Sequence, residues 1–162
     1  IEFQLVFLQH LCQHPFKVLP ILCGSFQECL EQPLEPESRP EVRHFFSSLE
    51  RLLAGRSKTC WIASVDLAHV GQRFGGPALT TEALEQIQAL DVDTMSQAVQ
   101  ADAAGFLEAL RVDSGQRNYC GTSAIYTLLQ VLKPGPGKLL HYQQCNETQL
   151  TSTVTVASAY YP

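Results

Sequence analysis

A short apolar run, residues 59–65, leads directly into a polar, glycine-containing loop over residues 66–77. An apolar run of this length, bounded by such a loop, is typical of a strand buried in a sheet. In open α/β sheets, functional sites gather outside the carboxyl ends of the strands. The run therefore favours a layered α/β domain whose functional groups lie in this loop.

Asp66 and His69 are the groups in that loop with the chemistry of a catalytic site. An imidazole transfers protons near neutral pH, and a neighbouring carboxylate fixes its tautomer. Because the two residues are three apart on a loop, both side chains can project into one crevice. A structural alternative stays open, in which Asp66 caps a turn and His69 is a core or surface histidine with satisfied hydrogen bonds.

Cys145 opens a second polar loop, residues 145–150, after Tyr142 and two glutamines. A thiolate in such a loop is suited to ligate copper, iron or zinc, or to act as a nucleophile. The alternative is a half-buried free thiol with no chemical role. Cys120 precedes Gly121 at the start of a helix and is more simply explained by packing.

The other histidines are weaker candidates. His10 and His14 have the i, i+4 spacing of a metal-binding pair, but Pro15 frays the turn and no third ligand lies nearby in the sequence. His44 belongs to a solvated helix face, and His141 lies in the middle of a predicted strand.

Hydrophobic periodicity and turn residues divide the chain into helices and strands. Helices are expected at residues 1–13, 40–54, from Thr80 or Thr81 to Leu90, 94–100, 103–111 and in a segment ending at Leu132, and strands at residues 17–23, 59–65, 138–144 and 152–161. Thr80 or Thr81 is expected to cap the helix that runs to Leu90, Asp91 or Asp93 the helix at 94–100, and Asp102 the helix at 103–111. This order of elements predicts one layered α/β domain over residues 1–162 with a mixed sheet.

The composition argues against several classes of protein. The 162 residues carry 11 Lys and Arg and 16 Asp and Glu, a net charge of −5, which offers no basic surface for nucleic acid. The sequence has no apolar run near the roughly 18 residues of a membrane span, and its first residues lack the pattern of a signal peptide. Six cysteines without a C-x-x-C pair indicate reduced thiols in a cytoplasmic protein.

Six segments of the chain resemble the Memo-like proteins, the B component of the AmmeMemoRadiSam set, and occur in the same order. They are IEFQLVFLQ (1–9), VLPILCGS (18–25), IASVDLAHVGQRF (62–74), NYCGTSAIYTLL (118–129), YQQC (142–145) and TVTVASAYY (153–161). The stretch S-x-D-x-x-H-x-G-Q-R-F is the most specific part. The family is similar in fold to the LigB-type class III extradiol dioxygenases, which implies a three-layer α/β/α domain with a metal site at strand ends.

The resemblance implies a role for each candidate residue. His69 takes the place of the family's acid/base, Asp66 that of the aspartate beside it, and Cys145 that of the late cysteine ligand of copper or iron, with zinc as a further choice. The family's two histidine ligands would fall before residue 1, because the motif E-H-S-x-E ends at Ile1-Glu2. The chain is therefore expected to be the C-terminal part of a longer domain, without those ligands and without the N-terminal strands of the sheet.

Three functions follow as hypotheses. The first is a Memo-like, dioxygenase-related redox protein that binds a metal and a small molecule. The second is a non-catalytic signalling module that binds peptides, notably phosphotyrosine segments, with Arg73 as the anion partner. The third is a truncated product that folds poorly and does nothing alone, since an unpaired sheet edge favours aggregation.

Overall fold

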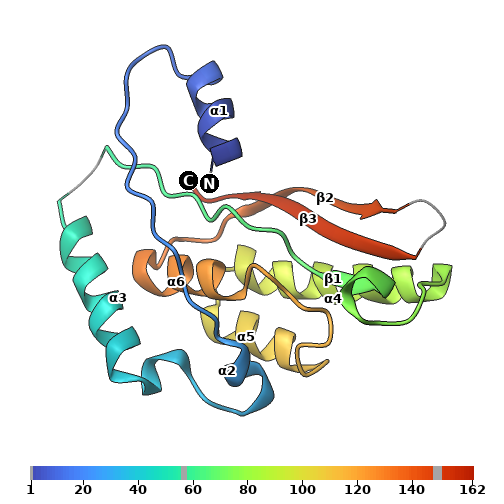
Figure 1. Ribbon diagram of the computed structural model, residues 1–162. Coiled ribbons are helices and arrows are strands. Elements are labelled where there is room, and N and C mark those ends of the chain that lie inside the picture. The colour runs from blue at the N-terminus through green and yellow to red at the C-terminus, as the bar shows by residue number, and fades with distance from the viewer. Residues whose placement is uncertain (1, 56–57, 148–150) are drawn as a thin grey trace.

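The computed structural model of the protein describes residues 2–55, 58–147 and 151–162 (Figure 1). Its helices are α1 (Glu2–Leu11), α2 (Gln27–Glu31), α3 (Pro40–Leu53), α4 (Thr81–Val99), α5 (Ala103–Arg111) and α6 (Thr122–Leu132), and its 3-10 turns are η1 (Pro36–Ser38) and η2 (Gln72–Phe74). Its strands are β1 (His69–Gly71), β2 (Lys138–Asn146) and β3 (Ser152–Tyr160). The helices and the sheet confirm the expected α/β class.

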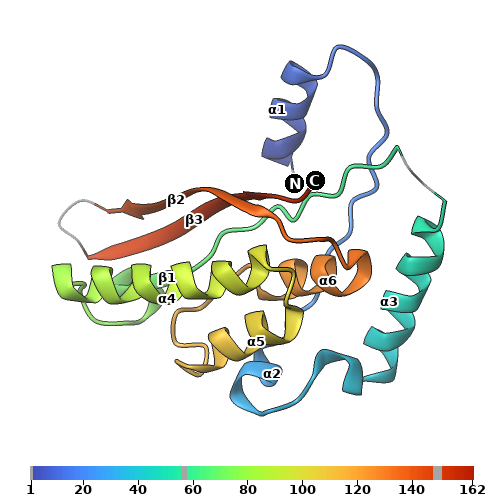
Figure 2. The ribbon, with the colours of Figure 1, turned by 180° about the vertical axis from the view of Figure 1, so that it is seen from behind.

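The strands form a sheet in the order β1-β3-β2. Both pairings are antiparallel, so the sheet of the described residues differs from the mixed sheet expected from the order of elements. Helices α4, α5 and α6 lie on one side of this sheet, and α1 stands on the other side, apart from the rest (Figures 1 and 2). Of the expected outer layer opposite α4, the described residues contribute α1 alone.

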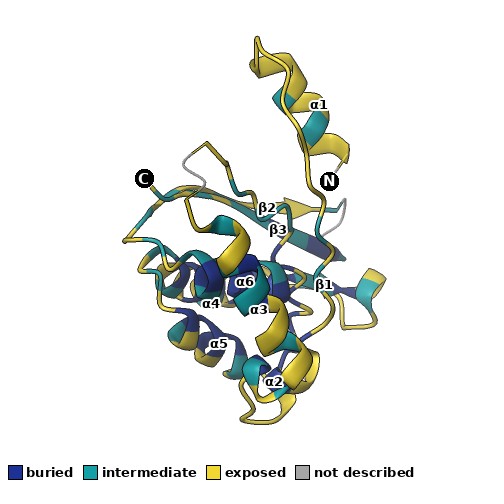
Figure 3. Ribbon diagram, turned by 90° about the vertical axis from the view of Figure 1, so that its left-hand side faces the viewer, coloured by how far each residue is buried: buried dark blue, intermediate teal, exposed yellow. Residues whose placement is uncertain are grey.

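The core lies between the sheet-side helices and α3. Its most deeply buried side chains include Phe106 and Leu107 of α5 and Tyr126 and Leu129 of α6, each at most 2% exposed. The Tyr126 ring meets Phe26 edge-on, with 6.0 Å between the centroids. Burying a side chain of this size stabilises the fold by about 1.5–3 kcal/mol. In contrast, α1 has no buried residue (Figure 3).

Helix caps agree with the sequence at two positions. The Thr80 side chain accepts a hydrogen bond from the backbone N–H of Ala83 (3.2 Å) at the start of α4, and Asp102 accepts one from Gly105 (2.8 Å) at the start of α5. Between them, α4 runs without a break from Thr81 to Val99. The prediction of two helices with a cap at Asp91 or Asp93 is therefore wrong.

The predicted strand at residues 17–23 is absent, and the segment is irregular. Leu19 and Leu22 are 74% and 95% exposed. Pro20 lacks the N–H that a ladder requires, which explains why this apolar run joins no sheet.

The predicted strand at residues 59–65 is also wrong. Trp61, Ala63 and Val65 pack against the core at alternate positions, so the run is extended and partly buried but has no strand assignment. Regular pairing begins only at His69. The apolar residues thus indicate that one side of this run is buried. They do not show that the run lacks a neighbouring strand.

The predicted strands at residues 138–144 and 152–161 form the hairpin of β2 and β3. Cys145, expected in a loop, lies in β2. Residues 148–150 of that expected loop lie outside the described residues. None of the described helices is both long and apolar enough to cross a membrane.

Candidate functional site

The segment before His69 is fastened to β3 and to the start of α6. Leu67 N–H donates to the carbonyl oxygen of Thr155, and Thr155 N–H donates to that of Ala68, both at 2.9 Å. Ala68 N–H donates to Thr155 Oγ1 at 2.9 Å. On the other side, Cys120 N–H donates to the Leu67 carbonyl oxygen at 2.9 Å. The segment is therefore held between two elements far apart in the sequence.

The backbone of His69 is also fully bonded. Its N–H donates to the Arg117 carbonyl oxygen (2.7 Å), and its own carbonyl oxygen accepts from Asn118 Nδ2 (3.1 Å). Asn118 has φ 46°, a left-handed conformation that asparagine tolerates better than most residues. Every backbone N–H and C=O from Leu67 to His69 thus has a partner. These bonds fix the position of the backbone from which the imidazole extends.

The imidazole of His69 has an acceptor oxygen near each nitrogen and is one-fifth exposed. Nδ1 lies 3.2 Å from the Leu67 carbonyl oxygen, and Nε2 lies 3.7 Å from Asp66 Oδ2. The Phe74 ring meets it edge-on at 5.2 Å. Both neighbours can only accept, but Leu67 is at hydrogen-bond distance and Asp66 Oδ2 is beyond it, so the Leu67 contact favours the tautomer with hydrogen on Nδ1. Nε2 is then the atom free to take a proton.

His69 forms part of the wall of an open cleft of about 470 Å³. The rest of its lining comes from residues 23–27, from Phe74, and from residues 118–120 and 122–123 at the start of α6. Its lining includes the thiols of Cys23 and Cys120 and the amide of Asn118. Asp66 is not part of the lining. His69 is therefore accessible from this open cleft.

Cys145 lies in the same row of the sheet as His69. Both residues are directly opposite Val154, His69 on β1 and Cys145 on β2. Their Cα atoms are roughly 10 Å apart, because opposite residues on neighbouring antiparallel strands are separated by about 5 Å.

The row faces away from the helices. Gln144 precedes Cys145, and Thr155 follows Val154. Their side chains bond to Leu84 and Asp91 of α4. Since side chains alternate along a strand, Cys145 and Val154 point to the opposite face, and so does His69. The fold therefore turns a predicted acid/base and a predicted thiolate toward the same side.

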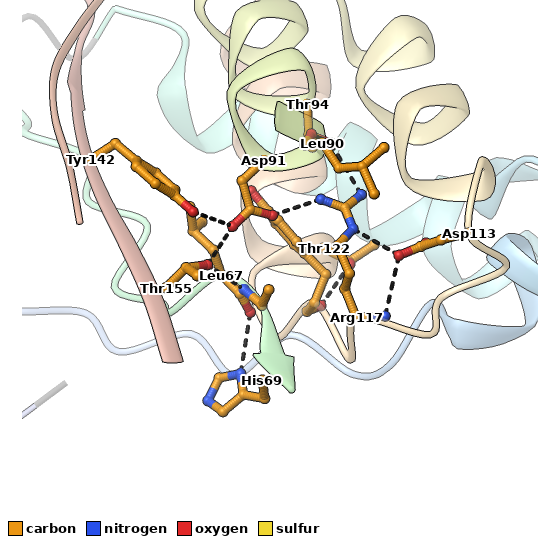
Figure 4. Close-up of polar contacts among 12 residues, drawn as sticks. Leu67, His69, Leu90, Asp91, Thr94, Asp113, Arg117, Thr122, Tyr142 and Thr155 are labelled. Atoms are coloured by element: carbon orange, nitrogen blue, oxygen red, sulfur yellow. Dashed lines mark hydrogen bonds and ion pairs between the residues drawn. The ribbon is translucent and has the colours of Figure 1, made fainter. Parts of the chain in front are cut away.

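Behind this row lies a buried network that the sequence analysis missed (Figure 4). Asp91 is fully buried, and Arg117 is 3% exposed. Arg117 Nη1 donates to Asp91 Oδ1 at 2.6 Å, and Arg117 Nε donates to Asp113 Oδ2 at 2.7 Å. Thr155 Oγ1 and the Tyr142 hydroxyl donate to Asp91 Oδ2 at 2.5 and 3.1 Å.

Burial shifts the protonation equilibrium of this network. Removal from water raises the pKa of the Asp91 carboxyl, and the Thr155 hydrogen bond and the Arg117 charge oppose that rise. Because Asp91 accepts from three side chains, each of its oxygens is bonded despite complete burial. The only sequence signal was an aspartate within a helical pattern, and it does not identify a partner 26 positions away.

The chain matches the family model described as "Memo-like protein" over residues 1–161. This chain belongs to the Memo-like family. The match confirms the resemblance drawn from the six segments and covers nearly all of the 162 residues given. A search of the curated proteins found no match.

The donor set of this Memo-like chain fits a metal only in part. A cysteine thiolate is a good ligand for copper, iron and zinc, and Cys145 is exposed in the row that includes His69. Among residues 2–55, 58–147 and 151–162, however, no three His, Cys, Asp or Glu side chains gather closely enough to hold an ion. The described residues therefore bring only the predicted ligand Cys145 and the predicted base His69 to one face of the sheet.

The remaining candidates of the Memo-like chain lie apart from the row. His10 is in α1 and His14 follows its end, and both are exposed. His44 is exposed on α3. Arg73 Nη1 is paired with Glu147 Oε1 at 2.8 Å, so its charge is already matched. His141 is exposed in β2, four residues before Cys145.

Proposed function

We propose that this Memo-like chain acts in a metal-dependent redox protein, with His69 as acid/base and Cys145 as a thiolate ligand of copper or iron. The observation that supports the proposal best is the row His69–Val154–Cys145, which turns both groups to one face. The family match supports the fold but not this activity.

His69 would move the proton through Nε2. Its Nδ1 hydrogen is engaged by the Leu67 carbonyl oxygen, so Nε2 would take and return the proton. Asp66 Oδ2, 3.7 Å away, stabilises the imidazolium once it forms. The Asp66 side chain is 55% exposed, so water weakens this attraction.

Cys145 would supply one donor of the metal shell. Copper or iron, when bound, supplies one-electron chemistry with dioxygen, and zinc is the non-redox alternative. Cys145 is the one donor that this proposal takes from the described residues.

A Cu(I) affinity measurement tests the proposed ligand. We expect Cys145→Ser to weaken Cu(I) binding at least roughly tenfold in competition with a chromophoric chelator. Cys60→Ser is the matched control, because Cys60 is also exposed but lies outside the sheet. Equal affinity in wild type and Cys145→Ser would refute the ligand assignment.

The acid/base role has a separate readout. With ascorbate as the reductant, His69→Ala should keep the Cu(I) affinity and slow dioxygen consumption by roughly 100-fold. A parallel loss of affinity and rate would instead make His69 a ligand.

The peptide-binding alternative has less support. Its proposed anion partner, Arg73, is engaged by Glu147, and Arg73 is not among the residues that line the cleft. A phosphotyrosine peptide that binds equally well with and without a chelator would favour that function.

A further inference from the structure

The buried network reaches the backbone of His69 by two routes. In the first, Ala68 N–H donates to Thr155 Oγ1 (2.9 Å), and that hydroxyl donates to Asp91 Oδ2 (2.5 Å). In the second, His69 N–H donates to the Arg117 carbonyl oxygen (2.7 Å), and the Arg117 guanidinium donates to Asp91 Oδ1 (2.6 Å). Both routes converge on one carboxylate.

These routes also govern the contact that selects the tautomer. The Leu67 carbonyl oxygen that receives His69 Nδ1 belongs to the residue immediately before Ala68. Leu67 N–H is itself fixed to the Thr155 carbonyl oxygen at 2.9 Å. A shift of Thr155 would therefore move the acceptor and the ring that it orients at the same time.

We infer that Thr155 and Asp91 are positioning residues, which hold the backbone at residues 67–69 so that the His69 imidazole keeps its hydrogen on Nδ1 and leaves Nε2 unprotonated. This inference rests on the proposed acid/base role of His69. Neither residue lines the cleft, so both act through the backbone and not on a ligand.

The neighbouring threonine provides a matched control on the same strand. Thr153 and Thr155 are 1% and 0% exposed, and both lie in β3. Thr155 Oγ1 has two hydrogen-bond partners, whereas Thr153 Oγ1 has none among the described residues. The same threonine-to-valine change therefore removes the link at one position and no hydrogen bond at the other.

The experiment records the tautomer of His69 by long-range ¹H–¹⁵N NMR on protein labelled at histidine, with the signal assigned from His69→Gln. In wild type, the Nδ1–H form should predominate. Thr155→Val should lower the ratio of Nδ1–H to Nε2–H about fivefold, the order expected for the loss of one hydrogen bond. Thr153→Val should keep the wild-type ratio, and Thr155→Ser should restore it.

Two results from wild type and Thr155→Val would overturn the inference. One is a wild-type ratio in Thr155→Val, which would make the network a purely structural feature. The other is a predominant Nε2–H form in wild type. If Thr155→Val does not fold, Tyr142→Phe replaces it, because it removes one donor from Asp91 Oδ2 at the half-buried side of the network. It should shift the ratio in the same direction, and an unchanged ratio would be a third contradiction.

The outcome is separable from that of the proposed function. The tautomer is measured without any metal, whereas the ligand assignment depends on Cu(I) affinity. If the tautomer responds as expected but Cys145→Ser leaves Cu(I) affinity unchanged, only the metal proposal falls. If the affinity responds and the tautomer does not, only the positioning role falls.

Discussion

His69 and Cys145 lie in one row of the sheet, yet their surroundings differ sharply. The backbone around His69 is fully hydrogen-bonded and is supported by the buried pair of Asp91 and Arg117. Cys145 is exposed near the end of β2, two residues before Glu147. The proposed acid/base is therefore preorganised by this chain, whereas the proposed ligand is exposed to solvent.

Breaking the support of His69 should have the largest effect. Arg117→Ala leaves the fully buried Asp91 without its ion partner and should lower the free energy of unfolding by about 3–5 kcal/mol. Arg73→Ala removes the exposed pair with Glu147 near Cys145 and should cost less than about 1 kcal/mol. Urea unfolding measures both, and equal losses would erase the distinction between the two regions.

The alkylation rates of two thiols compare the exposed end of β2 with the core. Burial raises the pKa of the Cys29 thiol, and Cys29 is 2% exposed, whereas Cys145 is exposed. Iodoacetamide should modify Cys145 on the order of 100-fold faster than Cys29. Mass spectrometry of peptides gives the rates, and exposed Cys60 should react about as fast as Cys145. If Cys145 were modified as slowly as Cys29, its thiol would not be exposed as described.

The side-chain bond to His69 should have a smaller effect. Asn118→Gly keeps the left-handed φ of 46° but removes the donor to the His69 carbonyl oxygen, and should cost about 1 kcal/mol. Ser114→Gly is the control, since Ser114 is exposed and has φ 52°. Thermal unfolding measures both, and equal changes would show that the Asn118 amide does not support His69.

The pH dependence of stability should show the smallest effect. Because the folded-state pKa of Asp91 is raised by burial, its contribution to stability is complete below the unfolded value of about 3.9 and is lost as the pH rises through the folded value. The free energy of unfolding of wild type minus that of Asp91→Asn should therefore fall as the pH rises above 4. Denaturant titrations across this range check the sign, and a rising difference would refute it.

Local patterns in the sequence were enough for part of the fold. The amphipathic periods of α3 and α5, the caps at Thr80 and Asp102 and the alternation in β3 all depend on neighbours a few residues apart. They also sufficed to predict that Asp66 and His69 lie close together, because residues three positions apart on a loop cannot separate far.

The remainder depends on distant partners. The run at residues 59–65 is apolar enough for a strand but has no regular ladder. Asp91 resembles a helix cap in the sequence, and its ion pair with Arg117 is evident only in the structure. The row of His69 and Cys145 requires the register of β3 against both neighbours. No local pattern encodes that register.

The hydrogen bond between Ala68 and Thr155 also has a consequence for the order of folding. It joins positions 87 residues apart, whereas β2 pairs with its neighbour β3 in a hairpin. Closing a long loop costs entropy before its contacts can form, so we expect the hairpin and the helices to form before β1 docks. During synthesis on the ribosome, His69 would then stay unoriented until β3 has emerged, and a half-made chain could not begin the proposed proton chemistry.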